Sequence, residues 1–235
     1  KELRAGRRTR ENLYVERASI YGFLAVGHAR SANSSEIVWA DYLAARVATR
    51  RAMGIAPSYF PFDVGLWTPA DVLEAGEGLS DGQRAELIAD IYSTLDRVDP
   101  KDLSPDQRER FHTRRAKLGA LLNDSQLEDG AIKDLESERP QVAAFLRARL
   151  IGAGVLSSSA TTFDAEARES AQRAASYLEA RSATIAADPR ALRLWLELRW
   201  AGETGQRLLR EDRRRIPWDV QSRRALLRIV RDLKA

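Results

Sequence analysis

Apolar residues recur along this chain at spacings of three and four positions, which is the period of an α-helix. Ile88, Ile91, Tyr92 and Leu95, for example, occupy positions i, i+3, i+4 and i+7 of one helical face. No segment alternates β-branched and polar residues with a period of two, and no Asn-Gly or Asp-Gly pair joins two such runs. The pattern therefore predicts an all-α fold.

Helix-start signatures occur at six places in the chain. In Ser104-Pro105-Asp106-Gln107 the serine can cap the helix, the proline fits the first helical position, and the glutamine can accept from the serine's backbone N–H. The same arrangement, complete or in part, occurs at residues 33–36, 68–71, 80–83, 125–128 and 188–189. One such signature is weak, but six in one chain favour a series of short helices.

The periodicity and the start signatures together define the expected helices, which are 11–31, 35–54, 69–76, 81–98, 105–122, 126–138, 140–152, 164–187, 189–202, 205–214 and 218–233. Residues 56–66 and 157–163, which are rich in Pro, Ser and Thr, are expected to be loops. The helix over 191–201 is apolar nearly all round, interrupted only by Arg193, Glu197 and Arg199, so neighbours must cover it on more than one side.

Prolines that could open helices are regularly spaced in the middle of the chain. Pro69, Pro105 and Pro140 are separated by 36 and 35 residues, whereas Pro189 and Pro217 break this period. A repeat of about 34 residues holds two antiparallel helices with their turns. The spacing therefore favours helical hairpins repeated along part of the chain.

Small and large apolar residues within these units lie at spacings that resemble the tetratricopeptide repeat. The positions that carry the resemblance are Leu118, Gly119, Leu122, Ala131 and Leu135 in one unit, and Ala45, Ala52 and Pro57 in another. Small residues allow the two helices of a hairpin to approach closely, and large ones fill the groove between hairpins. The resemblance implies antiparallel hairpins stacked as an α-solenoid, whose inner surface binds partner segments.

The layout also resembles the helical-repeat regions of large bacterial multidomain signalling proteins, including STAND-type NTPases. The phosphate-binding motif Gly-x4-Gly-Lys-[Ser/Thr] does not occur in this chain, so the resemblance implies a sensor or scaffold segment, not a motor. We expect a basic N-terminal segment at residues 1–10, a helical hairpin with a Pro-rich elbow at 11–67, and a repeat array at 68–235, all in one continuous domain.

Composition and charge narrow the function classes. The 235 residues are 44% hydrophobic and 31% charged with a net charge of +4, which excludes both a polycation and a disordered tail. The absence of cysteine excludes disulfides, thiolate zinc sites, iron–sulfur clusters and a cysteine nucleophile. The basic start is not followed by an apolar signal segment, and the longest apolar run, 150–156, is far shorter than the roughly 20 residues of a membrane span. We therefore expect a cytoplasmic chain without a membrane partner.

The sequence contains no catalytic constellation. His28 and His112 are the two histidines, and neither an HExxH zinc motif nor a Gly-x-Ser-x-Gly elbow occurs. Gly152-Ala153-Gly154 loosely resembles a dinucleotide loop, but it follows a predicted helix where that chemistry needs a strand. We therefore expect no catalytic residue, no cofactor and no metal site, and we favour a non-enzymatic role.

Aromatic residues beside the Pro-rich segments are the candidate contacts for a partner. Phe60, Trp67 and Trp218 are these residues, and the segment 60–64 has an echo at 216–220 that suggests a repeated elbow. Aromatic side chains often dominate binding hot spots. The leading hypothesis is a non-catalytic helical-repeat scaffold or sensor that binds a protein or peptide partner, or other domains of the same polypeptide.

An arginine stripe near the C-terminus supports an alternative. Arg224, Arg228 and Arg231 are spaced i, i+4 and i+7, so they share one face of the predicted helix and could bind an anion such as a phosphate backbone. Interspersed acidic residues dilute this charge, and no aromatic platform accompanies it. Nucleic-acid binding through this face is therefore the second hypothesis.

Overall fold

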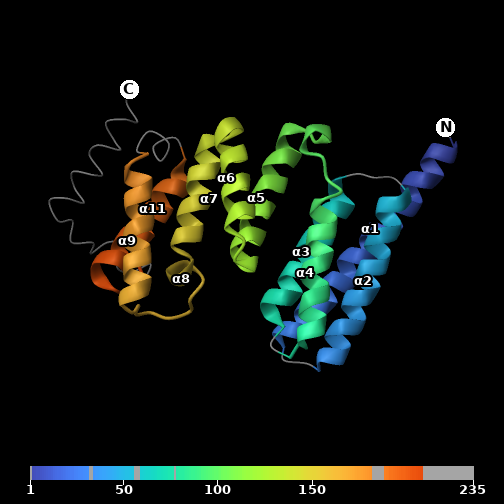
Figure 1. Cartoon of the computed structure of the whole chain (residues 1–235), viewed down its shortest axis with the longest axis horizontal. Coiled ribbons are helices and arrows are strands. Elements are labelled where there is room, and N and C mark those ends of the chain that lie inside the picture. The colour runs from blue at the N-terminus through green and yellow to red at the C-terminus, as the bar shows by residue number, and fades with distance from the viewer. Residues whose placement is uncertain (1, 32–33, 56–58, 77, 182–187, 209–235) are drawn as a thin grey trace. The chain divides into compact units, whose positions relative to one another are not determined.

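The computed structural model describes residues 2–31, 34–55, 59–76, 78–181 and 188–208 (Figure 1). Within these ranges the fold is all-α, as the periodicity predicted, and one isolated bridge between Thr162 and Gln206 is the nearest approach to a strand. The helices are α1 (Glu2–Arg30), α2 (Ser35–Ile55), α3 (Tyr59–Ala75), α4 (Asp81–Leu95), a 3-10 turn (Pro100–Asp102), α5 (Pro105–Leu122), α6 (Ser125–Glu138), α7 (Pro140–Ile151), α8 (Ala153–Leu156), α9 (Ala165–Glu179) and α11 (Pro189–Thr204).

The chain divides into two compact units, residues 1–128 and 129–235, which we call unit 1 and unit 2. The division predicted between residues 67 and 68 falls inside α3, and the basic segment predicted at 1–10 forms, from Glu2 onward, the beginning of the long helix α1. Each unit is described separately below.

Unit 1 contains antiparallel helical hairpins. In the first, Arg51 near the end of α2 lies over the ring of Tyr14 in the first half of α1, and Asp41 in the first half of α2 bonds His28 near the end of α1. The buried face of α1 is rich in small residues, and a Cβ added at Gly22 would lie 2.7 Å from the Thr68 side chain of α3. This glycine therefore allows α1 to pack closely on α3.

Two of the predicted helix starts are complete capping boxes. Ser80 accepts from the backbone N–H of Gln83, and the Gln83 side chain accepts from the backbone N–H of Ser80. Ser104 and Gln107 make the same reciprocal pair at the start of α5. These signatures are confirmed because capping is a local interaction within four residues.

The start of α6 differs from the prediction in one detail. Asp124, not Ser125, accepts from the backbone N–H of Leu127. The turn before it is tight: Asn123 adopts the left-handed conformation with φ 53°, and a Cβ added at Gly119 would lie 2.5 Å from the backbone nitrogen of Glu128. Gly119 thus has the role predicted for a small residue in a hairpin, since it lets the two helix backbones approach.

The segment predicted as a loop at 56–66 is helical from Tyr59, and Pro69 lies inside α3 instead of opening it. A proline inside a helix removes one backbone hydrogen bond and costs roughly 3 kcal/mol or more. Burial of Val64, Leu66 and Val72 on this helix offsets that cost, at about 1.5–3 kcal/mol for each side chain. Tertiary packing therefore overrides the local signal of Thr68-Pro69.

Unit 2 is built around α11, which packs on α9 and α7. Trp195 and Leu198 are fully buried, and Ala174 of α9 contributes to the same apolar cluster. A Cβ added at Gly152 would lie 2.4 Å from the side chain of Leu198, and one at Gly202 would lie 2.6 Å from that of Gln172. The prediction that α11 is covered on more than one side is confirmed.

Two helices predicted in unit 2 have other bounds in the structure than the sequence indicated. The helix predicted at 164–187 ends at Glu179, and the loop at 157–163 is present as expected. The helix predicted from residue 205 does not start there, because Gly205 ends α11 with φ 67° and residues 206–208 are not helical. The remainder of that predicted helix, and the one at 218–233, lie outside the described residues.

Asp188 caps α11, and its charge makes the cap pH-dependent. Its carboxylate accepts from the backbone N–H of Arg190 at 2.9 Å and from the Arg190 guanidinium at 2.9 Å, and this side-chain bond lowers the pKa of Asp188. Because the pKa of Asp188 is lower in the folded than in the unfolded state, the cap stabilises the fold fully at pH values above the unfolded-state pKa of about 3.9. This stabilisation is lost as the pH falls through the folded-state pKa.

We therefore expect Asp188→Ala to lower the free energy of unfolding of unit 2 by about 1 kcal/mol at pH 7, and the gap to the wild type to shrink below about pH 4. Thermal unfolding at pH 7 and pH 3 measures this. Asp188→Asn keeps a capping oxygen without the charge, so its free energy of unfolding at pH 7 is expected to lie between those of the wild type and Asp188→Ala. A stability difference between the wild type and Asp188→Ala that is the same at pH 7 and pH 3 would contradict a charge-dependent cap at Asp188.

Candidate functional site

Exposed large apolar side chains are confined to unit 1 among the residues whose burial the structure describes. Five of them lie on α1, three on α2, and one each on α3 and α4. These residues are Leu13, Ile20, Tyr21, Phe23, Leu24, Ile37, Leu43, Val47, Phe60 and Tyr92. A contiguous apolar patch is typical of an interaction site, whereas single exposed apolar residues are common on any protein surface.

Three of these residues form a line along α1, which we call the α1 seam: Leu13, Ile20 and Leu24. Their spacing of seven and four residues places them on one side of the helix, opposite the side that buries Ala18 and Ala25. They are 47%, 58% and 43% exposed. Helix α1 is therefore apolar on two opposite faces, and only one of them is covered by α2 and α3.

Arginine interrupts this seam. Arg17 lies between Leu13 and Ile20 on the same side of α1, and Arg10 lies one turn before Leu13. Both residues are exposed, and Arg17 makes no hydrogen bond or ion pair with any residue that the structure describes. The seam therefore alternates apolar side chains with a cation that has no partner in the described part of the chain.

The predicted contact residues have different positions. Phe60 is exposed on α3, and Trp67 lies seven residues later on the same side of that helix. Trp67 is half-buried because it packs against the apolar core of unit 1, and its ring also contacts Phe23 of α1 with the ring centroids 5.1 Å apart. Trp218 lies outside the described residues.

The predicted anion-binding residues Arg224, Arg228 and Arg231 also lie outside the part of the chain that the structure describes. Of the two histidines, His28 bonds Asp41 at 3.0 Å, and His112 is buried in α5 beside Arg115. Over the described ranges, no group of three or more histidine, aspartate and glutamate side chains is arranged to hold a metal ion.

A second feature of unit 1 is a buried carboxylate that the sequence analysis did not single out. Asp90 of α4 accepts a hydrogen bond from the Tyr42 hydroxyl at 2.5 Å and pairs with Arg46 at 2.7 Å and Arg50 at 2.9 Å. Tyr42, Arg46 and Arg50 are spaced four residues apart, so they form one column on α2. Burial and the bond to Asp90 raise the pKa of Tyr42, which therefore stays protonated and donates.

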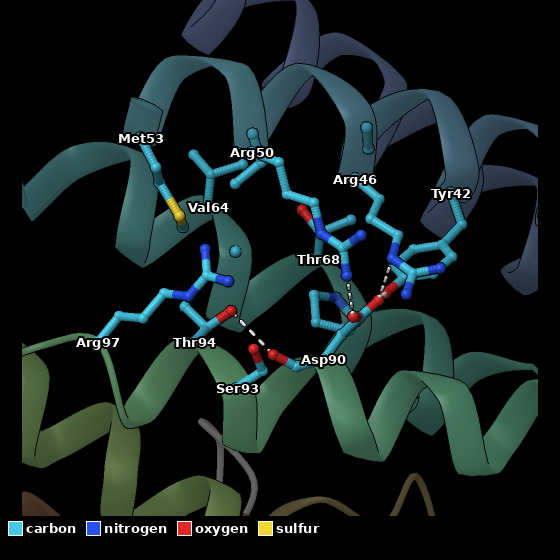
Figure 2. A pocket seen from close by; sticks show the side chains of 14 residues that line it. Tyr42, Arg46, Arg50, Met53, Val64, Thr68, Asp90, Ser93, Thr94 and Arg97 are labelled. Atoms are coloured by element: carbon cyan, nitrogen blue, oxygen red, sulfur yellow. Dashed lines mark hydrogen bonds and ion pairs between the residues drawn. The ribbon is translucent and has the colours of Figure 1, made fainter. Parts of the chain in front are cut away.

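These side chains line a pocket between α2, α3 and α4 with a cavity volume of about 30 Å³ (Figure 2). Its inner wall includes Val64 and Gly65, and a Cβ at Gly65 would lie 2.9 Å from the Met53 side chain. Arg97 and Ser93, which are both exposed, line its outer side. The pocket can hold small polar species, but it contains no nucleophile paired with a general base among the described side chains.

Comparisons with known proteins give no further constraint, because no family model, no curated protein and no solved structure matches the chain. In the described ranges, no helix combines the length and the apolar character that crossing a bilayer requires. Any functional proposal must therefore follow from the α1 seam and the pocket.

Proposed function

We propose that this chain is a non-catalytic scaffold or sensor module, part of a larger bacterial protein, that binds a helical segment of a protein partner through the α1 seam. The proposal includes the tetratricopeptide-like stacking of hairpins and the cytoplasmic location, both of which are predictions from the sequence. The exposed apolar line of Leu13, Ile20 and Leu24 is the observation that supports it most directly.

The spacing of the seam favours a helix as the partner. Apolar residues at alternating intervals of three or four form the contact line where two helices pack side by side. Leu13, Ile20 and Leu24 follow this interval, with Arg17 at the intervening position. A partner helix with an apolar line of the same period would cover the seam.

The charge of the seam favours an acidic partner. Arg10 and Arg17 are exposed on this side of α1, and the sequence before them adds Arg4, Arg7 and Arg8 on the same helix. Opposite charges across an interface fix the register and exclude partners of like charge. We therefore expect the partner helix to carry Glu or Asp where it faces Arg17.

A synthetic helical peptide tests this proposal. The peptide has leucines at heptad spacing and glutamate opposite Arg17, and fluorescence anisotropy with the full chain measures its dissociation constant. We expect Ile20→Asp to weaken binding at least tenfold, about 1.4 kcal/mol, because a carboxylate would be placed in the centre of the apolar contact. Ile20 is exposed, so this change should alter the stability of the fold by less than about 0.5 kcal/mol.

Val47→Asp is the matched control, since Val47 is 50% exposed but lies on α2. It should leave the affinity within about twofold. Arg17→Glu should weaken binding of the glutamate peptide and restore it for a peptide with arginine at that position. Equal affinities for the wild type and Ile20→Asp would overturn the proposal, as would self-association of the chain that Ile20→Asp abolishes, because the occupant would then be a second copy.

Nucleic-acid binding through Arg224, Arg228 and Arg231 stays a prediction from the sequence. A filter-binding titration of duplex and single-stranded DNA across salt concentrations tests it, because phosphate contacts make affinity fall steeply with salt. No binding at low salt would remove this alternative.

A further inference from the structure

The pocket between α2, α3 and α4 has more positive charge than its own carboxylate neutralises. Arg46, Arg50 and Arg97 line it, and Asp90 is the carboxylate among the lining residues; three positive groups and one negative group give a formal charge of +2. Glu86, which does not line the pocket, also pairs with Arg46, at 3.1 Å, and offsets one of these positive charges. The pocket is therefore electropositive.

Arg97 is the arginine of this pocket that has no carboxylate partner among the described residues. It makes no hydrogen bond or ion pair with the residues that the structure describes, whereas Arg50 is held by Asp90 at 2.9 Å. In Figure 2 the side chain of Arg50 reaches into the pocket from α2, that of Arg97 reaches in from the turn after α4, and Ser93 lies on α4. Two guanidinium groups and a hydroxyl thus face one opening.

One hydrogen-bonding group further inside the pocket is incompletely satisfied. The Nε of Arg46 lies 2.7 Å from Asp90, yet it makes no aligned hydrogen bond. Thr68 also has a buried hydroxyl without a hydrogen-bond partner, but this hydroxyl lies against Gly22 of α1, which does not line the pocket. Arg50 and Arg97 are therefore the groups that a bound polar species would meet.

The size of the cavity limits what that species can be. A water needs roughly 10–15 Å³ of such volume, so about 30 Å³ admits two or three waters or a group of a few heavy atoms that keeps one side in solvent. Guanidinium groups bind oxyanions through paired, charge-assisted hydrogen bonds. A phosphoryl group fits the positive charge and the size, since its oxygens can accept from two arginines and a hydroxyl at once.

We infer that this pocket binds a phosphoryl group, of inorganic phosphate or of a small phosphate monoester, between Arg50 and Arg97. Ser93 donates its hydroxyl to one oxygen, and Arg97 closes the outer side. Asp90 does not contact the anion; it positions Arg50 and offsets the repulsion between Arg46 and Arg50. This site is separate in function from the α1 seam, and neither proposal depends on the other.

Isothermal titration calorimetry of the full chain at constant ionic strength tests the inference, with inorganic phosphate in one arm and glycerol phosphate in the other. We expect a dissociation constant on the order of 1 mM or lower in at least one arm. A glycerol phosphate affinity at least tenfold above that of inorganic phosphate identifies a monoester as the ligand, and similar affinities identify the free anion; both results support the site.

Arg97→Gln should weaken binding at least tenfold. Arg51→Gln is the matched control: it removes the same charge from an exposed arginine of unit 1, but Arg51 lies over Tyr14 on the α1 side of α2. It should change the affinity less than twofold. Equal weakening by the two variants would show non-specific attraction to a basic surface, and no binding up to about 50 mM phosphate would also overturn the inference.

Discussion

Asp90→Ala is expected to lower the free energy of unfolding of unit 1 by about 3–5 kcal/mol, which is the usual cost of removing one partner from a buried ion pair. The carboxylate is the common partner of Tyr42, Arg46 and Arg50. Its removal leaves the buried Tyr42 hydroxyl without its acceptor, and it leaves two neighbouring guanidinium groups to repel each other.

Urea unfolding followed by circular dichroism measures the loss, and hydrogen exchange should locate it in α2, α3 and α4. Glu86→Ala is the matched control, since Glu86 lies one turn earlier on α4 and pairs with the same Arg46 at the surface. It should cost no more than about 1 kcal/mol. Equal losses for the two variants would mean that the buried network stabilises the fold no more than a surface ion pair does.

The positions of several helix starts could be predicted because their causes are local. Ser80 and Ser104 cap their helices through residues three positions later, and Asp188 does so within two. The interior position of Pro69 could not be predicted in this way, because it depends on contacts of α3 with helices distant in the sequence. Local chemistry fixes where a helix can start, and tertiary burial decides whether it continues.

The buried face of α4 shows a second limit of sequence patterns. Of the four residues that the periodicity selected, Ile91 and Leu95 are buried, but Tyr92 is exposed and Ile88 only half-buried. Leu87 and Asp90 are buried as well. A hydrophobicity pattern counts an aspartate as a solvent-facing residue, so it rotates the predicted face away from Asp90. The signal that could have located the site is the column of Tyr42, Arg46 and Arg50, a polar stripe on a helix whose neighbouring positions are apolar.

The α1 seam was missed for a related reason. Sequence periodicity on α1 identifies apolar positions, but it does not reveal which of two apolar faces the rest of the fold will cover. Of the aromatic residues chosen as contacts, Phe60 is exposed and Trp67 packs against Phe23. Proximity to a proline therefore located one exposed aromatic residue and one that is half-buried by an intramolecular contact.

Trp195→Ala is expected to lower the free energy of unfolding of unit 2 by about 3–5 kcal/mol. Trp195 is completely buried where α11 packs on α9, and its indole Nε1 donates to the Glu179 carboxylate at 3.0 Å. Truncation leaves a cavity lined by alanines and leucines that cannot extend into it, and it removes one of two donors from the half-buried Glu179 carboxylate, to which Arg199 also donates. Denaturant unfolding monitored by far-ultraviolet circular dichroism measures this loss.

A pair of tryptophan-to-phenylalanine variants separates the hydrogen bond from the volume. Trp200 lies on the same helix and its Nε1 is buried without a partner, so Trp195→Phe and Trp200→Phe remove the same atoms but only the first removes a hydrogen bond. We expect Trp195→Phe to be the more destabilising by about 1–3 kcal/mol, because it leaves Glu179 without this donor, whereas Trp200→Phe removes an unsatisfied polar group. If the two variants unfold at the same denaturant concentration, the Trp195–Glu179 bond contributes nothing to stability and the core of unit 2 depends on packing alone.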